Sequence, residues 1–347
     1  ITSNKEKLRT SVILGFFDQE GVVISSDYKR YSLRANLDYN LSDKIRIGVN
    51  IAPNYILDNI PRTDGSRGTG LLFNALHTWP IMPIYNEDGT RTEFNRFPAN
   101  TGNIFSYANW LNSAERITDG TKEVNLLSNA YIQYEPIKGL SIKSSLNAEL
   151  YNEQYEYFSP TNATYAINRP IPTNNEAVWD DRTTFSWLNE NTVNYNKSIG
   201  DHTFSVLGGF TYQKYRMDRN RVAASDFADD RLPNIQGAAN INRGGTFDQV
   251  QEWSLVSFLS RLTYNYKGKY LLTGSIRSDG SSRFGSDNRW GTFPSVSAGW
   301  IASDEKFLEN VESISLLKLR ASYGVTGNNN IGNYTQYALI NNTVNAV

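Results

Sequence analysis

Two pairs of adjacent carboxylates, Asp180-Asp181 and Asp229-Asp230, are the residues of this chain whose types come closest to catalytic machinery. Paired carboxylates act as acid and base in glycoside hydrolysis. Adjacent residues of an extended chain point in opposite directions, however, so neither pair forms an acid and base that face one substrate. We therefore predict that both pairs are solvated loop charges, and that the chain is not an enzyme.

Metal and phosphate chemistry also lack suitable residues. The chain has two histidines, His77 and His202, and no cysteine. We expect loop packing from His77 and a structural role beside a turn from His202. The segment 64–70, with Gly65, Gly68 and Gly70, lacks both the oxygen spacing of a calcium loop and the lysine of a phosphate-binding loop. These features predict turns and a flexible loop, with no metal site and no cofactor.

Large aromatic residues in the segments between predicted strands are better candidates for binding. Aromatic rings stack on the apolar C–H faces of sugars, and neighbouring Asn and Asp side chains can hydrogen-bond to hydroxyl groups. The alternative is that these rings pack the loops on one another or on a partner protein. The predicted ligand-contacting residues are Trp79, Tyr107, Trp110 and Trp179.

Strands with two unlike faces must hold these loops. From Tyr31 to Ile51, apolar residues alternate with polar ones, with a turn at 40–44. This period of two predicts a hairpin with one apolar face. Its other face carries Arg30, Arg34 and Arg46, which is too polar for the core of a β-sandwich. A sheet that is apolar on one side and polar on the other suits a transmembrane barrel with a wet lumen.

Similar hairpins recur at 126–150, 185–212, 253–276 and 293–325. With the hairpin at 31–51 and an opening strand from Arg9 to Phe17, the sequence predicts about eleven strands, most of them ~9 to 11 residues long and able to cross a bilayer. The tight turns share one rim, and the long connections near 57–122, 153–184 and 215–252 share the other. Residues 1–347 are therefore predicted to be one all-β, antiparallel transmembrane barrel domain with these loops outside the cell. A net charge of -1 gives no reason to expect nucleic acid.

Two further features refine this prediction. Tyrosine and tryptophan fall toward the predicted strand ends, as expected at bilayer interfaces. About eleven strands cannot close a single-chain barrel, because such barrels have even strand numbers and open edges are not tolerated in lipid. The segment is therefore expected to be about half of a larger barrel.

Several sequence stretches, in order along the chain, resemble the barrel of SusC/RagA-type TonB-dependent transporters of Bacteroidota. They are FDQEGV at 17–22, SDYKRYSLR at 26–34, DGSSRFG at 279–285, WGTFPSVSAGW at 290–300 and LKLRASYGVTGN at 317–328. The resemblance implies a 22-stranded outer-membrane barrel that holds a plug, takes energy from the TonB complex and imports glycans or peptides beneath a SusD-like lipoprotein. The plug, the TonB-interacting segment and the later strands are absent from this segment.

The cations on the polar face are predicted to line the lumen, where we expect contact with the plug in preference to steering of anionic ligands. They are Arg30, Arg34, Arg46, Arg277 and Arg320, together with Lys143, Arg261 and Lys318. A different class of function remains as an alternative, an outer-membrane adhesin whose loops bind a partner without uptake.

Overall fold

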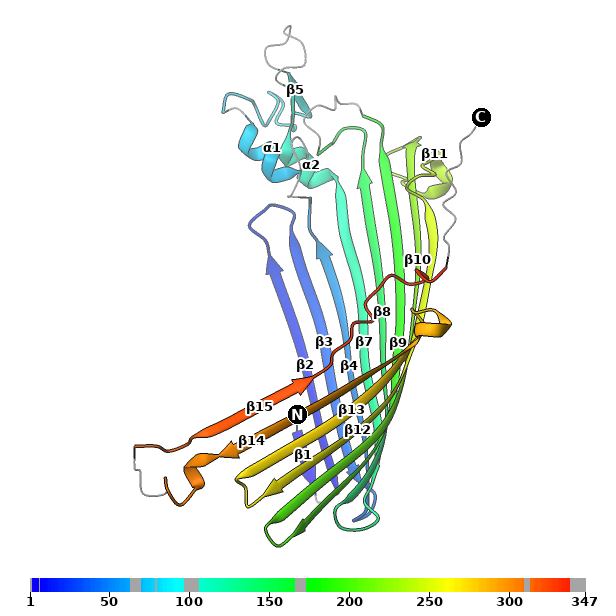
Figure 1. The fold of residues 1–347 in the computed structure, drawn as a ribbon. Coiled ribbons are helices and arrows are strands. Elements are labelled where there is room, and N and C mark those ends of the chain that lie inside the picture. The colour runs from blue at the N-terminus through cyan, green and yellow to red at the C-terminus, as the bar shows by residue number, and fades with distance from the viewer. Residues whose placement is uncertain are drawn as a thin grey trace.

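The computed structural model describes residues 2–5, 7–62, 70–78, 80–96, 106–165, 173–308 and 313–337; at 2, 4, 5, 94–96, 106 and 107 it describes the backbone alone. Figure 1 shows a strongly curved antiparallel sheet with two short helices above one end and the tight turns at the other. The chain therefore has a single large structural element, and its loops gather at one rim.

Neighbouring strands of this sheet are mostly consecutive in sequence, and their order is β1-β2-β3-β4-β7-β8-β9-β10-β12-β13-β14-β15, with β11 paired to β10. The separate hairpin of β5 and β6 interrupts this sequence between β4 and β7. The strand bounds are β1 Thr2–Lys5, β2 Leu8–Glu20, β3 Asp27–Asn40, β4 Ile45–Asn59, β5 Phe94–Arg96, β6 Ser106–Ala108, β7 Thr118–Tyr134, β8 Leu140–Ser159, β9 Glu176–Ile199, β10 His202–Phe227, β11 Ala238–Ile241, β12 Phe247–Tyr266, β13 Tyr270–Ser281, β14 Trp290–Ile301 and β15 Lys318–Gly324.

One continuous antiparallel register runs through each pair of neighbouring long strands. Residues that are paired with one another across the ladders therefore lie on the same face of the sheet from β2 to β15. Only a slip of one residue in the register would exchange the two faces. Large apolar side chains on one face are exposed instead of buried. They are Val12, Leu14, Phe16, Tyr31, Leu37, Val49, Ile51, Tyr55, Val124, Ile132, Tyr134, Ile142, Leu146, Leu150, Phe185, Val193, Tyr195, Val206, Phe210, Phe258, Leu262, Leu272, Ile276, Val296, Leu319 and Tyr323.

We call this set the apolar band and its side of the sheet the outward face. On β8 the outward-facing apolar side chains run from Leu140, which is half-buried, to Leu150. At about 3.3 Å per residue and a tilt near 45°, this stretch covers roughly 25 Å, the height of the apolar belt of an outer-membrane barrel. A face this apolar and this exposed needs lipid around it, because water would make it an aggregation surface.

The strands continue well past the band, so the predicted loop bounds are too wide. β4 ends at Asn59, β8 at Ser159 and β10 at Phe227, and the next long strands, β7, β9 and β12, begin at Thr118, Glu176 and Phe247. Beyond the band both faces meet water, so the apolar alternation that marks a strand in the sequence disappears although the ladder continues. The connections between these strands are 60–117, 160–175 and 228–246.

The connection 60–117 contains both described helices, α1 (Leu71–His77) and α2 (Trp110–Arg116). The side chain of Asn109 caps α2 by accepting hydrogen bonds from the backbone of Leu111 and Asn112. A small apolar cluster joins these helices to the neighbouring connection and contains Leu71, Ala114, Ile117, Ala163 and Tyr165, with Trp110 packed against it. The loops at this rim are thus held by a core of their own.

A second tie links the connection after β8 to the connection after β10. Asp230 accepts hydrogen bonds from the Thr161 backbone at 2.9 Å and from the Asn175 amide at 2.7 Å. Asn175 is buried and also bonds the backbone of Phe227 through both atoms of its amide. Burial of Asp230 disfavours its charged form, but the bonds from Thr161 and Asn175 hold the pKa of Asp230 below its ordinary value.

We predict that Asp230→Ala loosens this tie by about 1 kcal/mol, because it leaves the Thr161 and Asn175 donors without their acceptor. Hydrogen exchange in 160–165 and 173–176 should then be several-fold faster. Asp229→Ala is the matched control, since the Asp229 carboxylate bonds to exposed Arg231. With a lowered folded-state pKa, the wild-type protection should be complete above about pH 4 and lost as the pH falls through that pKa. Equal exchange in the two variants would contradict this role.

Candidate functional site

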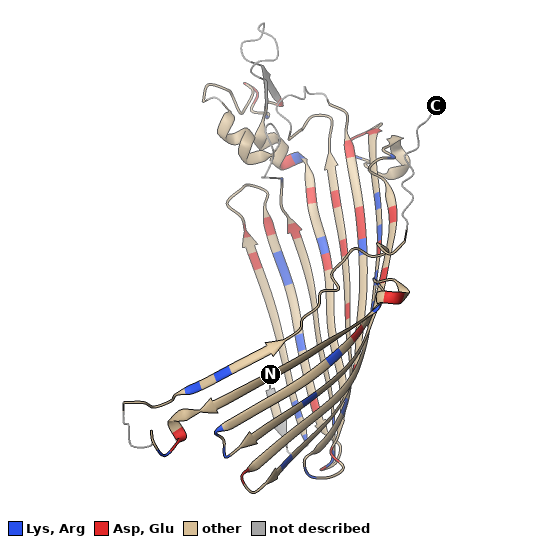
Figure 2. Cartoon of the chain, viewed as in Figure 1, with Lys and Arg blue, Asp and Glu red and all other residues tan. Residues whose placement is uncertain are grey.

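The face opposite the apolar band, here called the inner wall, is mostly polar, although Ile13, Phe17 and Leu127 are exposed on it. The long strands carry few charges in their lower halves, while both signs gather in the upper parts of β7 to β10 (Figure 2). The cations that were predicted to line the lumen all lie on this face. They are Arg30, Arg34, Arg46, Arg277 and Arg320, together with Lys143, Arg261 and Lys318. The structure therefore brings all eight cations to one face.

Their immediate surroundings differ. Arg46 donates to the Asn40 amide at 3.0 Å, and Arg277 donates to Asp279 at 2.7 Å. Arg30 lies over the ring of Phe17, 5.9 Å from its centroid. In the part of the chain that the structure describes, no carboxylate lies within ion-pair distance of Arg34 or Arg320, and both residues are exposed. These two cations are free to contact whatever fills the concave side.

A row of asparagines crosses the inner wall at one level. Asn50, Asn129 and Asn147 occupy registered positions on β4, β7 and β8. The Asn50 amide donates to the Asn129 carbonyl oxygen at 3.2 Å, and Asn129 donates to Asn147 at 2.8 Å. Asn147 in turn donates to the Glu190 carboxylate on β9 at 3.1 Å. The row forms a chain of hydrogen bonds with uniform direction, which gives the wall a neutral polar lining.

Below this row, a tyrosine spans three strands. Tyr131 on β7 donates to Asp38 on β3 at 2.5 Å, across Gly48 of the intervening strand β4. A Cβ at Gly48 would lie 2.2 Å from the Tyr131 ring, so this position requires glycine for the close approach. The Lys143 ammonium lies 4.5 Å from the centre of the same ring. The predicted lumen cation Lys143 is thus fixed in place by a cation–π contact.

Above the band, the inner wall holds an ion cluster. Arg219 binds the Asp180 carboxylate with two hydrogen bonds, at 2.8 and 2.6 Å, and Arg221 adds a third at 2.9 Å. The Asp180 side chain is 7% exposed. The hydrogen bonds from Arg219, helped by Arg221 and opposed by burial, hold the pKa of Asp180 below its ordinary value.

The interpretation of the adjacent carboxylates as solvated loop charges is therefore wrong for Asp180, which is buried and paired, and for half-buried Asp230. It fails because both arginines that pair with Asp180 come from the next strand and become neighbours only through the register of β9 and β10. The expectation that the paired carboxylates diverge is confirmed. Asp180 faces inward and Asp181 outward, while Asp229 bonds Arg231 and Asp230 bonds Thr161.

Only two of the four predicted ligand-contacting aromatics, Trp110 and Trp179, have side chains that the structure describes. Trp79 and the side chain of Tyr107 lie outside the described residues. Trp110 begins α2 and packs against the apolar cluster of the rim loops. Trp179 lies on the outward parity of β9, 6.3 Å from the ring of Phe227. Trp110 and Trp179 therefore pack as the alternative interpretation expected, and their ligand contact stays a prediction.

The histidines have structural neighbours. His77 stacks on Phe73 at 3.9 Å within α1, and His202 hydrogen-bonds Tyr264 at 2.8 Å beside the turn between β9 and β10. Among the described residues, no group of histidine, aspartate and glutamate side chains could hold a metal ion. No helix in the described ranges has the length and apolar character needed to cross a membrane.

Sequence reasoning missed the asparagine row and the Asp180 cluster. A signal for the row was present, because Asn36, Asn50, Asn129 and Asn147 fall at polar positions of successive hairpins. Aligning those hairpins by their turns would have placed the four side chains at one level. The Asp180 cluster had no comparable signal, since its strands continue beyond the region of apolar alternation.

A curved antiparallel sheet with an exposed apolar band on one face and hydrogen-bonded polar chains on the other is the wall of a transmembrane barrel. No protein-family model matches the chain. Over its whole length the chain is 34% identical to TonB-dependent receptor P26 of Formosa agariphila, and it covers 34% of that protein. Over 99% of its length it is 29% identical to TonB-dependent receptor SusC of Bacteroides thetaiotaomicron, and it covers 35% of that protein.

The fold shows the same relationship. A structure of the RagAB peptide transporter superposes with a TM-score of 0.81 and 25% identity, over 97% of this chain and 37% of that one. The predicted resemblance to SusC/RagA-type TonB-dependent receptors is confirmed, and so are the outer-membrane location and the prediction of a non-enzymatic protein. The chain spans about a third of the length of the curated relatives that it matches.

Proposed function

We propose that this chain forms part of the wall of an importer that carries oligosaccharides or peptides across the outer membrane with energy from the TonB complex. The observation that carries the proposal is the two-faced wall itself, which is similar along nearly its whole length to SusC and to a chain of the RagAB peptide transporter. A wall with polar hydrogen-bonding groups on its concave side suits the passage of a hydrated ligand.

The rest of the barrel follows from the edges of the sheet. Among the described residues, β15 has one strand partner, and β2 pairs on its outer side only with the short β1. Unpaired backbone groups of such an edge are not tolerated in lipid, so further strands must close the barrel. We infer that the rim with α1 and α2 faces the cell exterior, where the connections 60–117, 160–175 and 228–246 would meet a SusD-like lipoprotein.

Arg34 and Arg320 are the inner-wall cations proposed to contact a plug, because both are exposed and neither has an ion-pair partner among the described residues. Reversing both charges in the full-length protein should weaken retention of the plug, as measured by its release or by protease accessibility. Reversal of Lys267, a turn cation paired with Asp201, is the control. Unchanged plug retention in the double variant would contradict the assignment.

Uptake in living cells tests the proposed function. A strain that lacks the gene should lose accumulation of one member of a panel of labelled oligosaccharides and peptides, and the gene should restore it. The same loss is expected in cells without TonB. Ligand binding at the surface with no TonB-dependent accumulation would contradict import and favour the alternative of an adhesin barrel.

A further inference from the structure

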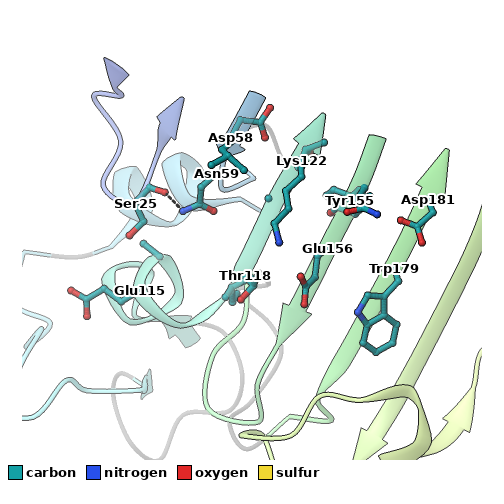
Figure 3. A pocket seen from close by; sticks show the side chains of 16 residues that line it. Ser25, Asp58, Asn59, Glu115, Thr118, Lys122, Tyr155, Glu156, Trp179 and Asp181 are labelled. Carbon is teal, nitrogen blue, oxygen red and sulfur yellow. Dashed lines mark hydrogen bonds between the residues drawn. The ribbon is translucent and has the colours of Figure 1, made fainter. Parts of the chain in front are cut away.

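A pocket of about 560 Å³ lies at the upper end of the sheet, where most of its lining residues have the outward parity. It is bordered by Ser25 of the β2–β3 turn and by Glu115 of α2, and its floor is formed by β4, β7, β8 and β9 (Figure 3). Most of its side chains on the sheet therefore project to the outward face, away from the asparagine row and the cations of the inner wall.

Two cross-strand rows build the floor. Gly120, Glu156 and Trp179 are direct partners on β7, β8 and β9, and Lys122, Gln154 and Asp181 form the next row. Gly120 allows a close approach of β4, because a Cβ there would lie 3.0 Å from the backbone oxygen of Asp58. The Trp179 ring packs edge-on against Phe227 and is therefore held in place. The pocket thus combines the indole of Trp179, which is held by its packing on Phe227, with polar side chains on the neighbouring strands (Figure 3).

The polar side chains of the pocket floor are free to bind a ligand. Lys122, Gln154, Glu156 and Asp181 are exposed, and none of the three charged side chains forms an ion pair among the described residues. An ammonium, an amide and two carboxylates around an aromatic ring can stack a sugar ring and exchange hydrogen bonds with its hydroxyl groups. The two carboxylates outnumber the lysine, which favours contact with the hydroxyl groups of a sugar over contact with its anionic substituents.

The height of the pocket identifies the source of the sugar. Lys122 lies two residues beyond Val124, the last residue of the apolar band on β7, and Asp181 lies four residues beyond Phe185 on β9. At about 3.3 Å per residue and a tilt near 45°, the row of Lys122, Gln154 and Asp181 is roughly 5 to 10 Å above the hydrocarbon edge, and Trp179, six residues beyond Phe185, is roughly 14 Å above it. The lower row therefore lies in the layer of lipid headgroups, and Trp179 lies just above that layer, where the saccharide of a glycolipid extends.

We propose that this pocket binds the saccharide headgroup of a glycolipid in the outer leaflet, with Trp179 stacked on a sugar ring and Glu156, Gln154, Asp181 and Lys122 bonded to its hydroxyl groups. The site fixes one lipid against the outer wall beside the rim loops. The proposal requires only the membrane position of the wall, so failure of the import assay leaves it standing.

The test uses the full-length protein in nanodiscs with and without lipopolysaccharide, the probe for an outer-leaflet glycolipid. Co-purifying lipopolysaccharide is quantified by mass spectrometry, and its affinity is measured by titration. Trp179→Leu should weaken binding about tenfold, the equivalent of one lost stacking contact of ~1.4 kcal/mol. Glu156→Gln, which keeps the size of the side chain, should weaken binding by a smaller factor.

Trp187→Leu is the matched control, because Trp187 lies on the same strand and face but inside the apolar band, where it packs on Tyr212. It should bind within about twofold of the wild-type protein. Equal affinity of the wild-type, Trp179→Leu and Glu156→Gln proteins would overturn the proposal. Equal binding of intact lipopolysaccharide and its lipid-free oligosaccharide would overturn the assignment to a membrane lipid and indicate a soluble glycan.

Discussion

Replacement of Leu146 by arginine is expected to destabilise the barrel by about 2–4 kcal/mol, the cost of an arginine on a lipid face near the bilayer midplane. Leu146 lies in the middle of the apolar band of β8, between Ile142 and Leu150. Its exposed side chain meets lipid, so a charge there cannot be solvated without distorting the membrane. The change is measured by reversible unfolding of the full-length protein in lipid bilayers.

Ser186→Arg is the matched substitution on the other face. Ser186 lies on the inner wall of the neighbouring strand β9, directly opposite Glu149 of β8. A new arginine there meets a carboxylate and a wet surface, so we expect little change in stability. If both arginines cost the same, or if the inner-wall variant were the less stable one, the assignment of the two faces would be wrong.

Asp180→Ala is expected to destabilise the upper wall by about 2–3 kcal/mol. The substitution leaves Arg219 and Arg221 side by side without the carboxylate that binds both. Removing one partner of a buried ion pair costs ~3–5 kcal/mol, and the partial exposure of the two arginines lowers that figure. The protein should also lose protection from hydrogen exchange in the upper parts of β9 and β10.

Asp181→Ala is the control for this prediction. Asp181 has the same charge and is adjacent in sequence, but it is exposed on the outward face and forms no ion pair with a described residue. It should therefore leave stability and exchange almost unchanged. Restoration of stability in the triple variant with Arg219→Met and Arg221→Met would show that the unpaired charges cause the loss, whereas equal effects of the two alanine substitutions would contradict the role of the cluster.

The faces of the sheet could be predicted from the sequence because one face meets lipid. Alternation from Tyr31 to Ile51 placed Arg34 and Arg46 on the polar side, and the register agrees. The same signal ends where lipid ends, which is why the upper parts of β9 and β10 were assigned to loops. Asp180 and Arg219 are far apart in sequence, and their contact depends on the pairing of those unrecognised segments.

The aromatic candidates illustrate a second limit. In the sequence, a tryptophan that contacts a ligand cannot be distinguished from one that packs beneath a loop, because both stand in a polar segment. Trp110 packs because α2 folds onto the cluster with Ala114 and Ile117. Trp179 was predicted to lie in a loop, but strand β9 begins at Glu176 and already includes it, and its position in that strand turns its ring outward. The face on which an aromatic ring lies depends on its position within the strand. The sequence around Trp179 does not show the alternation from which that position could be predicted.

Lipid on the apolar side of the sheet and water on the other side can be distinguished directly, residue by residue, along one strand. The described sequence has no cysteine, so single cysteines can be placed from Leu255 to Asn265 of β12 and spin-labelled in the full-length protein in bilayers. Accessibility to oxygen, which partitions into lipid, and to a water-soluble nickel complex is then measured at each position. We expect a period of two, with oxygen favoured at Phe258 and Leu262 and nickel at Arg261 and Thr263. Accessibility that does not alternate along the strand, or alternates in the opposite phase, would contradict this expectation.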